Sequence, residues 1–398
     1  MQFWEYIFIV SCSVVLYNYA GYAFLAALFN TLSRKIPPGN PVPDPYTPGI
    51  SFIVAAYNEE NLIRQKILNS LAQDYPPEKL ELIFVTDGSS DHTPSIVAQY
   101  PSVRLLHDPL RQGKSVAVNR AVAIATQEIL VFSDANTTLN KEAVLRIASH
   151  YRDAKVGGVA GEKKVIGSPG RDAAGEGEGL YWKYESRLKK IDSDFYSVVG
   201  AAGELFSLRK DMYEPIPPDT ILDDFVLSLK TAQKGFRIVY EPGAFAMELP
   251  SFSLADEQKR KIRIAAGGFQ SIVMLRSLLL FWRHPRLSFL YLSHRVLRWT
   301  LSPLCLILAF ISNLILCFQP DNHLFKVLFG LQLAFYAMAL LSRIPALVNN
   351  RYGKIFKIPY YFTFMNVSVI LGFFRFLKGG QSAAWEKARR AETGMIIE

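Results

Sequence analysis

The stretch LELIFVTDGSSDHT, residues 80 to 93, decides the fold, because an apolar run ends abruptly in acidic, glycine and hydroxyl residues. The same pattern, an apolar run that ends in polar residues, occurs twice more, in ISFIVAAYNEE at 50–60 and in ILVFSDANT at 129–137. Strands that are almost continuously apolar are typical of parallel sheets with both faces buried. We expect four strands, at Ser51–Ala56, Leu80–Thr86, Val103–His107 and Ile129–Ser133, alternating with helices at 59–73, 93–100 and 114–126. This alternation predicts an α/β domain over residues 50–258.

The polar ends of the strands are the first candidate site. In open α/β sheets, ligands bind outside the carboxyl ends of the strands. Those ends carry Tyr57-Asn58-Glu59, Asp87-Gly88-Ser89-Ser90-Asp91 and Asp134-Ala135-Asn136. One such cluster alone is ambiguous, since Asp, Asn and Ser also cap helices and form turns. Three clusters at one edge predict a site for a metal-bound diphosphate and a ribose.

A lysine at the start of a predicted helix is a further candidate. Gly113-Lys114-Ser115 suggests a P-loop, but Asp108 and Pro109 stand where the earlier glycine of that motif is needed. A Walker site is therefore excluded. Lys114 either meets a phosphate as a point charge or is a solvated residue at the helix start.

Composition indicates a membrane protein. The chain has 398 residues, half of them apolar, with a net charge of +9 and a mean hydropathy of +0.14. This excludes a disordered chain and is too apolar for an average soluble enzyme. The basic residues are dispersed or flank apolar runs, so nucleic acid is not expected as a partner. The three cysteines lie in apolar segments without metal-ligand spacing, which indicates packing roles in a reducing compartment.

The N-terminal region predicts a membrane span. Tyr6 to Phe29 is an uncharged run of about 24 residues, long enough to cross a bilayer as a helix. A cleaved signal peptide is the alternative, but the run is too long and has no basic segment before it. Arg34 and Lys35 follow, and the positive-inside rule then places the next domain in the cytoplasm. We therefore divide this region into a transmembrane helix at 1–33 and a Pro-rich linker at 34–49.

The C-terminal region predicts about three more spans within residues 299–378, at Trp299–Phe318, Val327–Ser342 and Ile358–Phe374. Three crossings would place the basic tail, 379–398, outside the cell, whereas its charge favours the inside. Either the last run is re-entrant or interfacial, or part of the preceding stretch also crosses. That stretch, 259–298, is expected to form interfacial amphipathic helices whose arginines face anionic lipid. The Gly-rich segment 167–179 is expected to be an exposed loop, with a lid over the donor as the alternative.

Seven motifs in order carry a family resemblance. They are VAAYNEE (54–60), VTDGSSDHT (85–93), QGKSVAVN (112–119), FSDANT (132–137), GAAGELFSLR (200–209), LDDF (222–225) and RKIRIAAGG (260–268). Together they resemble the membrane-bound family-2 glycosyltransferases, which include the cellulose, chitin and hyaluronan synthases. The resemblance implies an α/β GT-A domain, of the nucleotide-diphospho-sugar transferase kind, inserted between transmembrane helices.

The resemblance also implies how a nucleotide sugar, usually a UDP-sugar, is bound. Tyr57, Glu59 and Asp87 would hold the uracil and ribose, and Lys114 would lie near the nucleotide. The family's DxD motif is Asp134-Ala135-Asn136 here, so Asp134 and Asn136 would hold a divalent cation, Mg²⁺ or Mn²⁺, with the diphosphate. The amide of Asn136 can still bind a hard cation, but without a formal charge.

The catalytic base is implied by a second motif. The family's ED pair is Asp223-Asp224 here, with Asp224 in the place of the base. An acceptor hydroxyl must lose a proton as it attacks the anomeric carbon, and a carboxylate within hydrogen-bond reach can take it. The alternative is that the two aspartates favour a helix N-terminus through the macrodipole.

The chain departs from its processive relatives at one motif. Their QxxRW becomes RKIRI, with Arg260 in place of the glutamine and Ile264 in place of the tryptophan. Arg260 and Arg263 face either the diphosphate or lipid headgroups. Loss of the tryptophan, an acceptor platform in the family, puts processive extension in doubt. The tail contains Trp385-Glu386-Lys387-Ala388-Arg389, which resembles an element that relatives place at the cytoplasmic mouth of the site.

These observations predict an inverting glycosyltransferase in the inner or plasma membrane. Its partners would be a nucleotide-sugar donor, a saccharide or lipid-linked acceptor, and membrane lipids. The first hypothesis is transfer to a growing polysaccharide or glycan. The alternative is the addition of one sugar to a polyprenyl-phosphate-linked acceptor. A transporter with a nucleotide-sensing domain is a third possibility, but the spans contain few polar residues.

Overall fold

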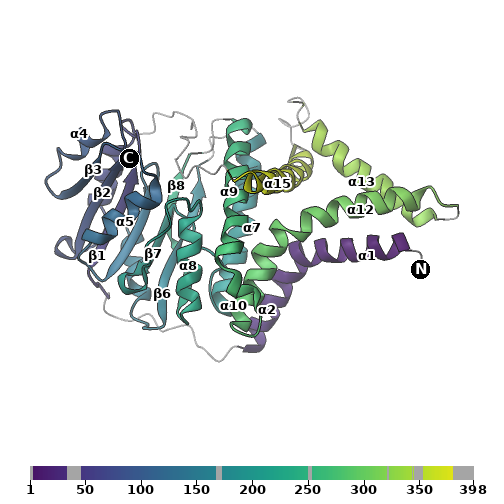
Figure 1. Ribbon diagram of the computed structural model, residues 1–398, viewed down its shortest axis with the longest axis horizontal. Coiled ribbons are helices and arrows are strands. Elements are labelled where there is room, and N and C mark those ends of the chain that lie inside the picture. Colours follow the sequence, from purple (N-terminus) through teal and green to yellow (C-terminus); the bar gives the residue numbers. More distant parts are fainter. Residues whose placement is uncertain are drawn as a thin grey trace.

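The computed structural model describes residues 3–33, 46–166, 173–249, 253–320, 322–342, 344 and 353–379. A strand-rich domain occupies one end of the molecule, and long apolar helices extend from the other (Figure 1). The motif at 385–389 and most of the linker and tail predicted above lie outside the described residues.

The first half of the sheet is parallel, as the apolar strand pattern predicts. It contains β1 (Ile50–Ala56), β2 (Leu80–Asp87), β3 (Val103–Asp108) and β4 (Ile129–Asp134), in the order β3-β2-β1-β4. In register, Ala56 lies opposite Thr86 and Ala55 opposite Asp134. The four predicted strands are confirmed, and their carboxyl ends lie at one edge.

The second half is mixed. β7 (Leu205–Arg209) pairs antiparallel with β4, β6 (Val156–Val165) pairs antiparallel with β7 and parallel with β8 (Arg237–Glu248), and β5 (Thr138–Leu139) closes the edge. The sheet thus has eight strands among the described residues.

Helices cover both faces of the sheet. α5 (Lys114–Ile124) and α8 (Asp223–Gln233) share one apolar core, while α3 (Ile63–Leu71) and α6 (Ala143–His150) share the other. Alternate residues of β1 enter the two cores, Ile53 into the first and Phe52 into the second. The short elements are η2 (Pro77–Lys79), α4 (Thr93–Val97) and η3 (Lys210–Met212).

A helical layer joins the sheet to the apolar helices. α7 (Ala173–Phe195) and α9 (Leu254–Met274) stand beside the sheet domain, with α15 (Gly353–Leu377) across them (Figure 1). α7 contacts α2 (Tyr22–Ser33), which follows α1 (Phe3–Leu16) and the π-turn η1 (Tyr17–Gly21). Residues 173–179 form the start of α7 and not the expected loop. Residues 167–172 of the same predicted loop lie outside the described residues.

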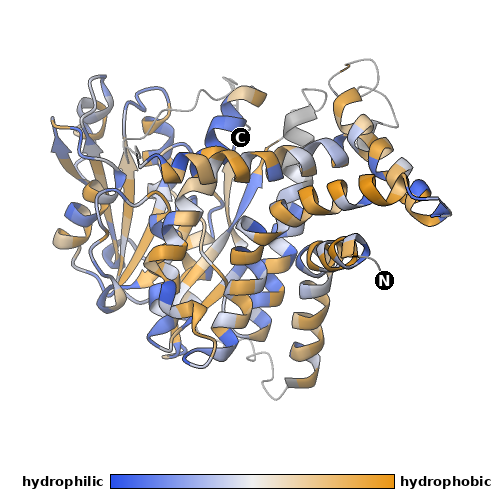
Figure 2. Ribbon diagram, turned by 45° about the vertical axis from the view of Figure 1, so that its right-hand side comes forward, coloured by the Kyte–Doolittle hydropathy of each residue, from blue (hydrophilic) through white to orange (hydrophobic). Residues whose placement is uncertain are grey.

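Three described helices are long and apolar enough to cross a membrane: Phe3–Leu32, His323–Leu341 (α13) and Ile355–Leu377. Most of the ribbon in these helices is coloured as hydrophobic (Figure 2). The N-terminal helix and the last two predicted runs agree with this result. The predicted run at Trp299–Phe318 does not qualify alone, because α12 (Leu301–Cys317) passes only when paired with Pro285–Trp299, from which it is bent by 51°.

The stretch before that bend differs from expectation. After α9 it forms η4 (Arg276–Leu279), α10 (Pro285–Tyr291), η5 (Leu292–Val296) and α11 (Leu297–Trp299). Arg298 and Arg295 both pair with Glu185 of α7. These two arginines therefore face the protein and not lipid, since a buried carboxylate compensates their charge.

Candidate active site

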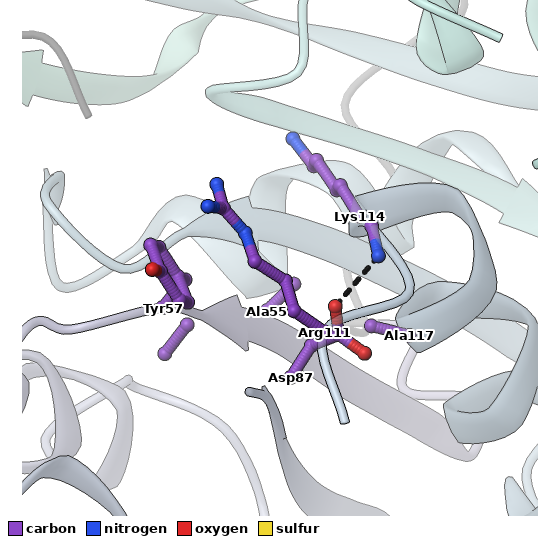
Figure 3. Close-up of a pocket in the computed structure, with 8 residues that line it drawn as sticks. Ala55, Tyr57, Asp87, Arg111, Lys114 and Ala117 are labelled. Carbon is purple, nitrogen blue, oxygen red and sulfur yellow. Dashed lines mark hydrogen bonds between the residues drawn. The ribbon is translucent and has the colours of Figure 1, made fainter. Parts of the chain in front are cut away.

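The carboxyl ends of β1 and β2 form a small pocket with the start of α5. Tyr57, Asp87, Arg111 and Lys114 line it, together with Gly113 and three alanines (Figure 3). Two predicted strand-end clusters are thus brought together with the predicted lysine.

Asp87 is fixed by the N-terminus of α5. Its Oδ2 accepts hydrogen bonds from the backbone N–H groups of Gln112 (2.9 Å) and Gly113 (2.6 Å). Its Oδ1 accepts one from Arg120 at 3.0 Å. Gly113 has φ +102°, a conformation that side-chain-bearing residues rarely adopt, so a glycine is needed at this helix start. The carboxylate is therefore held rigidly at the pocket wall.

Lys114 connects the pocket to a second, larger cavity. Its Nζ donates a 2.7 Å hydrogen bond to Oδ1 of Asp134, at the end of β4. Burial acts to lower the pKa of Lys114, but Asp134 and Asp223 outweigh it and raise the pKa above the ordinary value. Lys114 therefore remains a cation at neutral pH, in a position to meet a phosphate.

The second cavity has a volume of about 270 Å³. It lies between the sheet, α7, α8, α9 and α15. Its charged lining consists of Lys114, Asp134, Glu185, Lys189, Glu204, Asp223, Asp224, Glu248, Arg260, Lys261, Arg263 and Arg295. The predicted base, the diphosphate residues and Asp134 therefore share one cavity. α15, a candidate membrane span, contributes Met365, Ser368 and Val369.

Asp224 has the electrostatic setting of a proton acceptor. Burial raises its pKa to about 8, the adjacent Asp223 adds to the rise, and Lys114 opposes it. Gly203 lies beside both groups: a Cβ there would come within 3.3 Å of the Lys114 Nζ and 3.4 Å of Oδ2 of Asp224. The glycine thus leaves the space between cation and carboxylate open. Asp223 and Asp224 also begin α8, so the macrodipole reading of this pair fits as well.

The two arginines of the altered QxxRW motif line the cavity, which favours the diphosphate reading over lipid headgroups. Arg260 donates to both oxygens of Glu257, at 3.0 and 3.1 Å. Ile264 lines the cavity too, in the position of the family's tryptophan.

Two predicted residues lie apart from these cavities. Glu59 lines neither; its backbone carbonyl accepts hydrogen bonds from Leu62 and Ile63 as α3 begins. Asn136 lines neither cavity. Its Nδ2 lies 3.5 Å from Oε1 of Glu248, and Glu248 lines the second cavity.

Several site residues were not predicted from the sequence. The Arg111 guanidinium lies 3.9 Å from the centre of the Tyr57 ring, a cation–π contact over the predicted base-binding residue. Lys163 pairs with Glu204 at 2.5 Å and also with Glu248. Arg111 stands two residues before Gly113, so its place beside a phosphate-type turn is the signal that could have identified it.

α7 supplies the other unpredicted wall. Tyr181, Trp182, Glu185 and Lys189 all line the cavity. Lys189 is buried, and within the described part of the chain its Nζ has no hydrogen-bond partner. Burial lowers its pKa, with Glu185 opposing. A buried amine of this kind is suited to an oxygen atom of a ligand.

The residues present fit a divalent cation bound together with a diphosphate. Asp134 offers a carboxylate and Asn136 an amide oxygen, both of which suit hard cations. No group of three or more His, Cys, Asp or Glu side chains among the described residues forms a closed metal cage. Mg²⁺-type ions are commonly held by one or two carboxylates plus substrate phosphates, which matches this sparse donor set.

Residues 51–216 match the family model for glycosyl transferase family 2. The poly-beta-1,6-N-acetyl-D-glucosamine synthase of Staphylococcus aureus (strain MSSA476) is 28% identical over 236 residues, or 57% of this chain and 56% of the relative. The enzyme of the same name from Staphylococcus epidermidis is 25% identical over 242 residues, covering 59% and 57%. The chain thus matches a little over half the length of these curated relatives.

A solved structure has the same fold. The mannosyltransferase PcManGT from Pyrobaculum calidifontis, in complex with GDP-Man and Mn²⁺, aligns with a TM-score of 0.66 at 23% identity, over 94% of this chain and 99% of that one. The mixed sheet is accordingly GT-A-like. Over residues 51–216, the chain is therefore similar to glycosyl transferase family 2.

Proposed function

We propose that this protein is an inverting membrane glycosyltransferase that moves a sugar from a UDP-sugar to a growing polysaccharide or glycan. One observation carries the proposal: a single cavity is lined by Lys114 and Asp134, by Asp224, and by residues of a candidate membrane span. Donor, base and a membrane-directed acceptor would thus meet in one space.

The donor would span both cavities. Tyr57 and Asp87 would hold the uridine. Arg111, which lies over the Tyr57 ring, would either move away to admit the uracil base or close over it. Lys114, which lines both cavities, would lie at the diphosphate. Asp134 and Asn136 would hold a divalent cation, which supplies positive charge to the leaving diphosphate when bound. Arg260 and Arg263 would add to that charge from α9.

The reaction would be a single displacement. An acceptor hydroxyl oxygen attacks the anomeric carbon while the bond from that carbon to the diphosphate oxygen breaks, and UDP leaves with the electron pair. Asp224 takes the hydroxyl proton. Lys114 stabilises the negative charge that develops on the diphosphate. Attack on the face opposite the leaving group inverts the configuration at the carbon.

The acceptor would lie against α7 and α15. Trp182 and Tyr181 offer aromatic surface, and Lys189 offers a buried nitrogen. A polysaccharide fits the names of the curated relatives. The proposed side is the cytoplasm, because Arg34 and Lys35 follow the N-terminal span.

A lipid-linked acceptor is the second candidate. The α15 wall favours it, since Met365 and Val369 bring apolar surface from a candidate span into the cavity. Ile264 in place of the family's tryptophan favours it as well. One sugar would then be added to a polyprenyl-phosphate-linked saccharide at each encounter.

The test is turnover with purified protein. The protein in detergent is incubated with Mg²⁺ or Mn²⁺ and a donor panel of UDP-N-acetylglucosamine, other UDP-sugars and GDP-mannose; nucleotide release and product size are measured. UDP release that depends on one UDP-sugar, with a sugar chain as product, supports the first candidate. Release only after a polyprenyl-phosphate saccharide is added supports the second. No release with any donor and acceptor would contradict both.

A further inference from the structure

A buried lysine lies beneath the Asp134 motif. Lys66 is on α3, its relative exposure is 2%, and its Nζ is enclosed by oxygen atoms. It donates to Oγ of Ser133 at 2.7 Å, to the backbone carbonyl of Thr137 at 3.0 Å and to Oγ1 of Thr137 at 3.2 Å. None of the predicted site residues makes these contacts.

The oxygens that Lys66 binds belong to one turn. Thr137 Oγ1 donates to the carbonyl of Asp134 at 2.8 Å, and Ser133 Oγ lies 3.1 Å from Oγ1 of Thr137. Ser133 Oγ also donates to the carbonyl of Glu204 at 3.0 Å. Lys66 therefore joins the two ends of the segment that presents Asp134 and Asn136.

A lysine is a costly choice for this position. Burying an amine requires that its hydrogen bonds be made inside the protein, whereas an apolar side chain of similar length would need none. The Phe52 ring lies 5.7 Å from Nζ, so the surroundings also include apolar surface. Because Lys66 lines neither cavity and its Nζ contacts oxygens of the turn, the lysine acts on the turn and not on a ligand.

We propose that Lys66 is a positioning residue, which holds the 133–137 turn in the conformation with which Asp134 and Asn136 bind the cation and diphosphate of the donor. This inference rests on the proposed donor site. It assigns to α3 a part in donor binding without contact between Lys66 and the donor.

The test measures UDP affinity by calorimetry on the purified full chain, with and without Mn²⁺. Lys66→Met keeps the length and removes the nitrogen. We expect its UDP affinity to fall about tenfold in Mn²⁺ and by less than about twofold in EDTA, where Tyr57 and Asp87 still hold the nucleoside. The matched control is Arg64→Met on the exposed face of α3, where Arg64 bonds Tyr100 and Gln99; both affinities should stay unchanged.

A second pair of variants covers the case in which Lys66→Met does not fold. Thr137→Val removes the hydroxyl and Thr137→Ser keeps it, so the Mn²⁺-dependent loss should appear in the first and be rescued in the second. Equal losses with and without Mn²⁺, or no loss in folded Lys66→Met, would overturn the inference. If the wild-type chain itself binds no UDP, the proposed donor site fails first, which separates the two failures.

Discussion

The Lys114 ammonium nitrogen lies 2.7 Å from Oδ1 of Asp134, although the two residues belong to different elements, α5 and β4. The pair stands where the two cavities meet, and Asp223 and Asp224 are close enough to raise the pKa of the lysine. Lys114, which would bind the donor diphosphate, thus also opposes protonation of Asp224, the candidate base.

Removing that cation should weaken donor binding. Lys114→Met is expected to lower UDP-sugar affinity at least about tenfold, roughly 1.4 kcal/mol, because a diphosphate loses a partly buried positive partner. Calorimetric titration with UDP checks this. Lys79→Met is the matched control, since Lys79 is exposed, lines neither cavity and donates a 3.0 Å hydrogen bond to Oγ1 of Thr47. Equal affinities for the Lys114 variant and wild type would contradict the proposed role.

Activity should rise with pH. Asp224 has a pKa of about 8 and accepts a proton only as the carboxylate, so the transfer rate should increase toward pH 8 and level off above it. Asp223→Asn removes the adjacent negative charge, which lowers the pKa of Asp224 and should move the rise to lower pH. Initial rates at saturating donor from pH 5.5 to 9 measure both. A rise that stays in place in Asp223→Asn would count against the assignment.

The space at Gly203 should matter for transfer. In Gly203→Ala the new methyl group would crowd the Lys114 nitrogen and the Asp224 carboxylate at 3.3 and 3.4 Å. We expect kcat to fall about tenfold, about 1.4 kcal/mol in the barrier, while the thermal unfolding temperature changes little. Gly179→Ala is the control, because among the described residues no neighbouring atom lies within 4 Å of a Cβ there. An active Gly203→Ala would mean that the gap between cation and carboxylate is not needed.

The junction between α7 and the bent helix pair should be essential for stability. His294 is fully buried between Asp192 (2.6 Å) and Glu185 (3.3 Å). Replacing it with Ala removes the imidazole partner of the buried Asp192, which keeps the hydrogen bond from the Tyr22 hydroxyl, while Glu185 keeps Arg295 and Arg298. We therefore expect a loss of about 3 kcal/mol, at the lower end of the cost of breaking a buried pair. Thermal unfolding in detergent measures the loss. His150→Ala, which breaks a more exposed pair with Glu241, should cost much less; similar losses in the two variants would contradict the account.

The parallel strands and their polar ends could be predicted because both signals are local. An apolar run such as Phe52–Ala56 indicates a strand buried on both faces, and parallel pairing brings the ends of β1, β2 and β4 to one edge. The four strands were confirmed for this reason. The motif resemblance then named residues that the fold brings together, among them Asp134 and Asp224.

The residues that the sequence did not reveal depend on contacts distant in the chain. Lys66 meets Thr137 across 71 residues, and its helix carries no motif. The prediction of a loop at 173–179 was wrong. Gly and acidic residues favour a loop locally, whereas the packing of α7 against α2 and α15 outweighs that preference. Arg295 was assigned to lipid because a carboxylate on another element, Glu185, cannot be seen from local charge.

The central claim is that Asp224 removes the acceptor proton, and Asp224→Asn tests it most directly. The variant keeps the shape of the side chain but cannot act as a base. Sugar transfer and UDP affinity should be measured on the same detergent-purified preparation. The account predicts that transfer falls by roughly 10²–10⁴-fold while UDP affinity stays within about twofold of wild type. Transfer at the wild-type rate with intact UDP binding would contradict it.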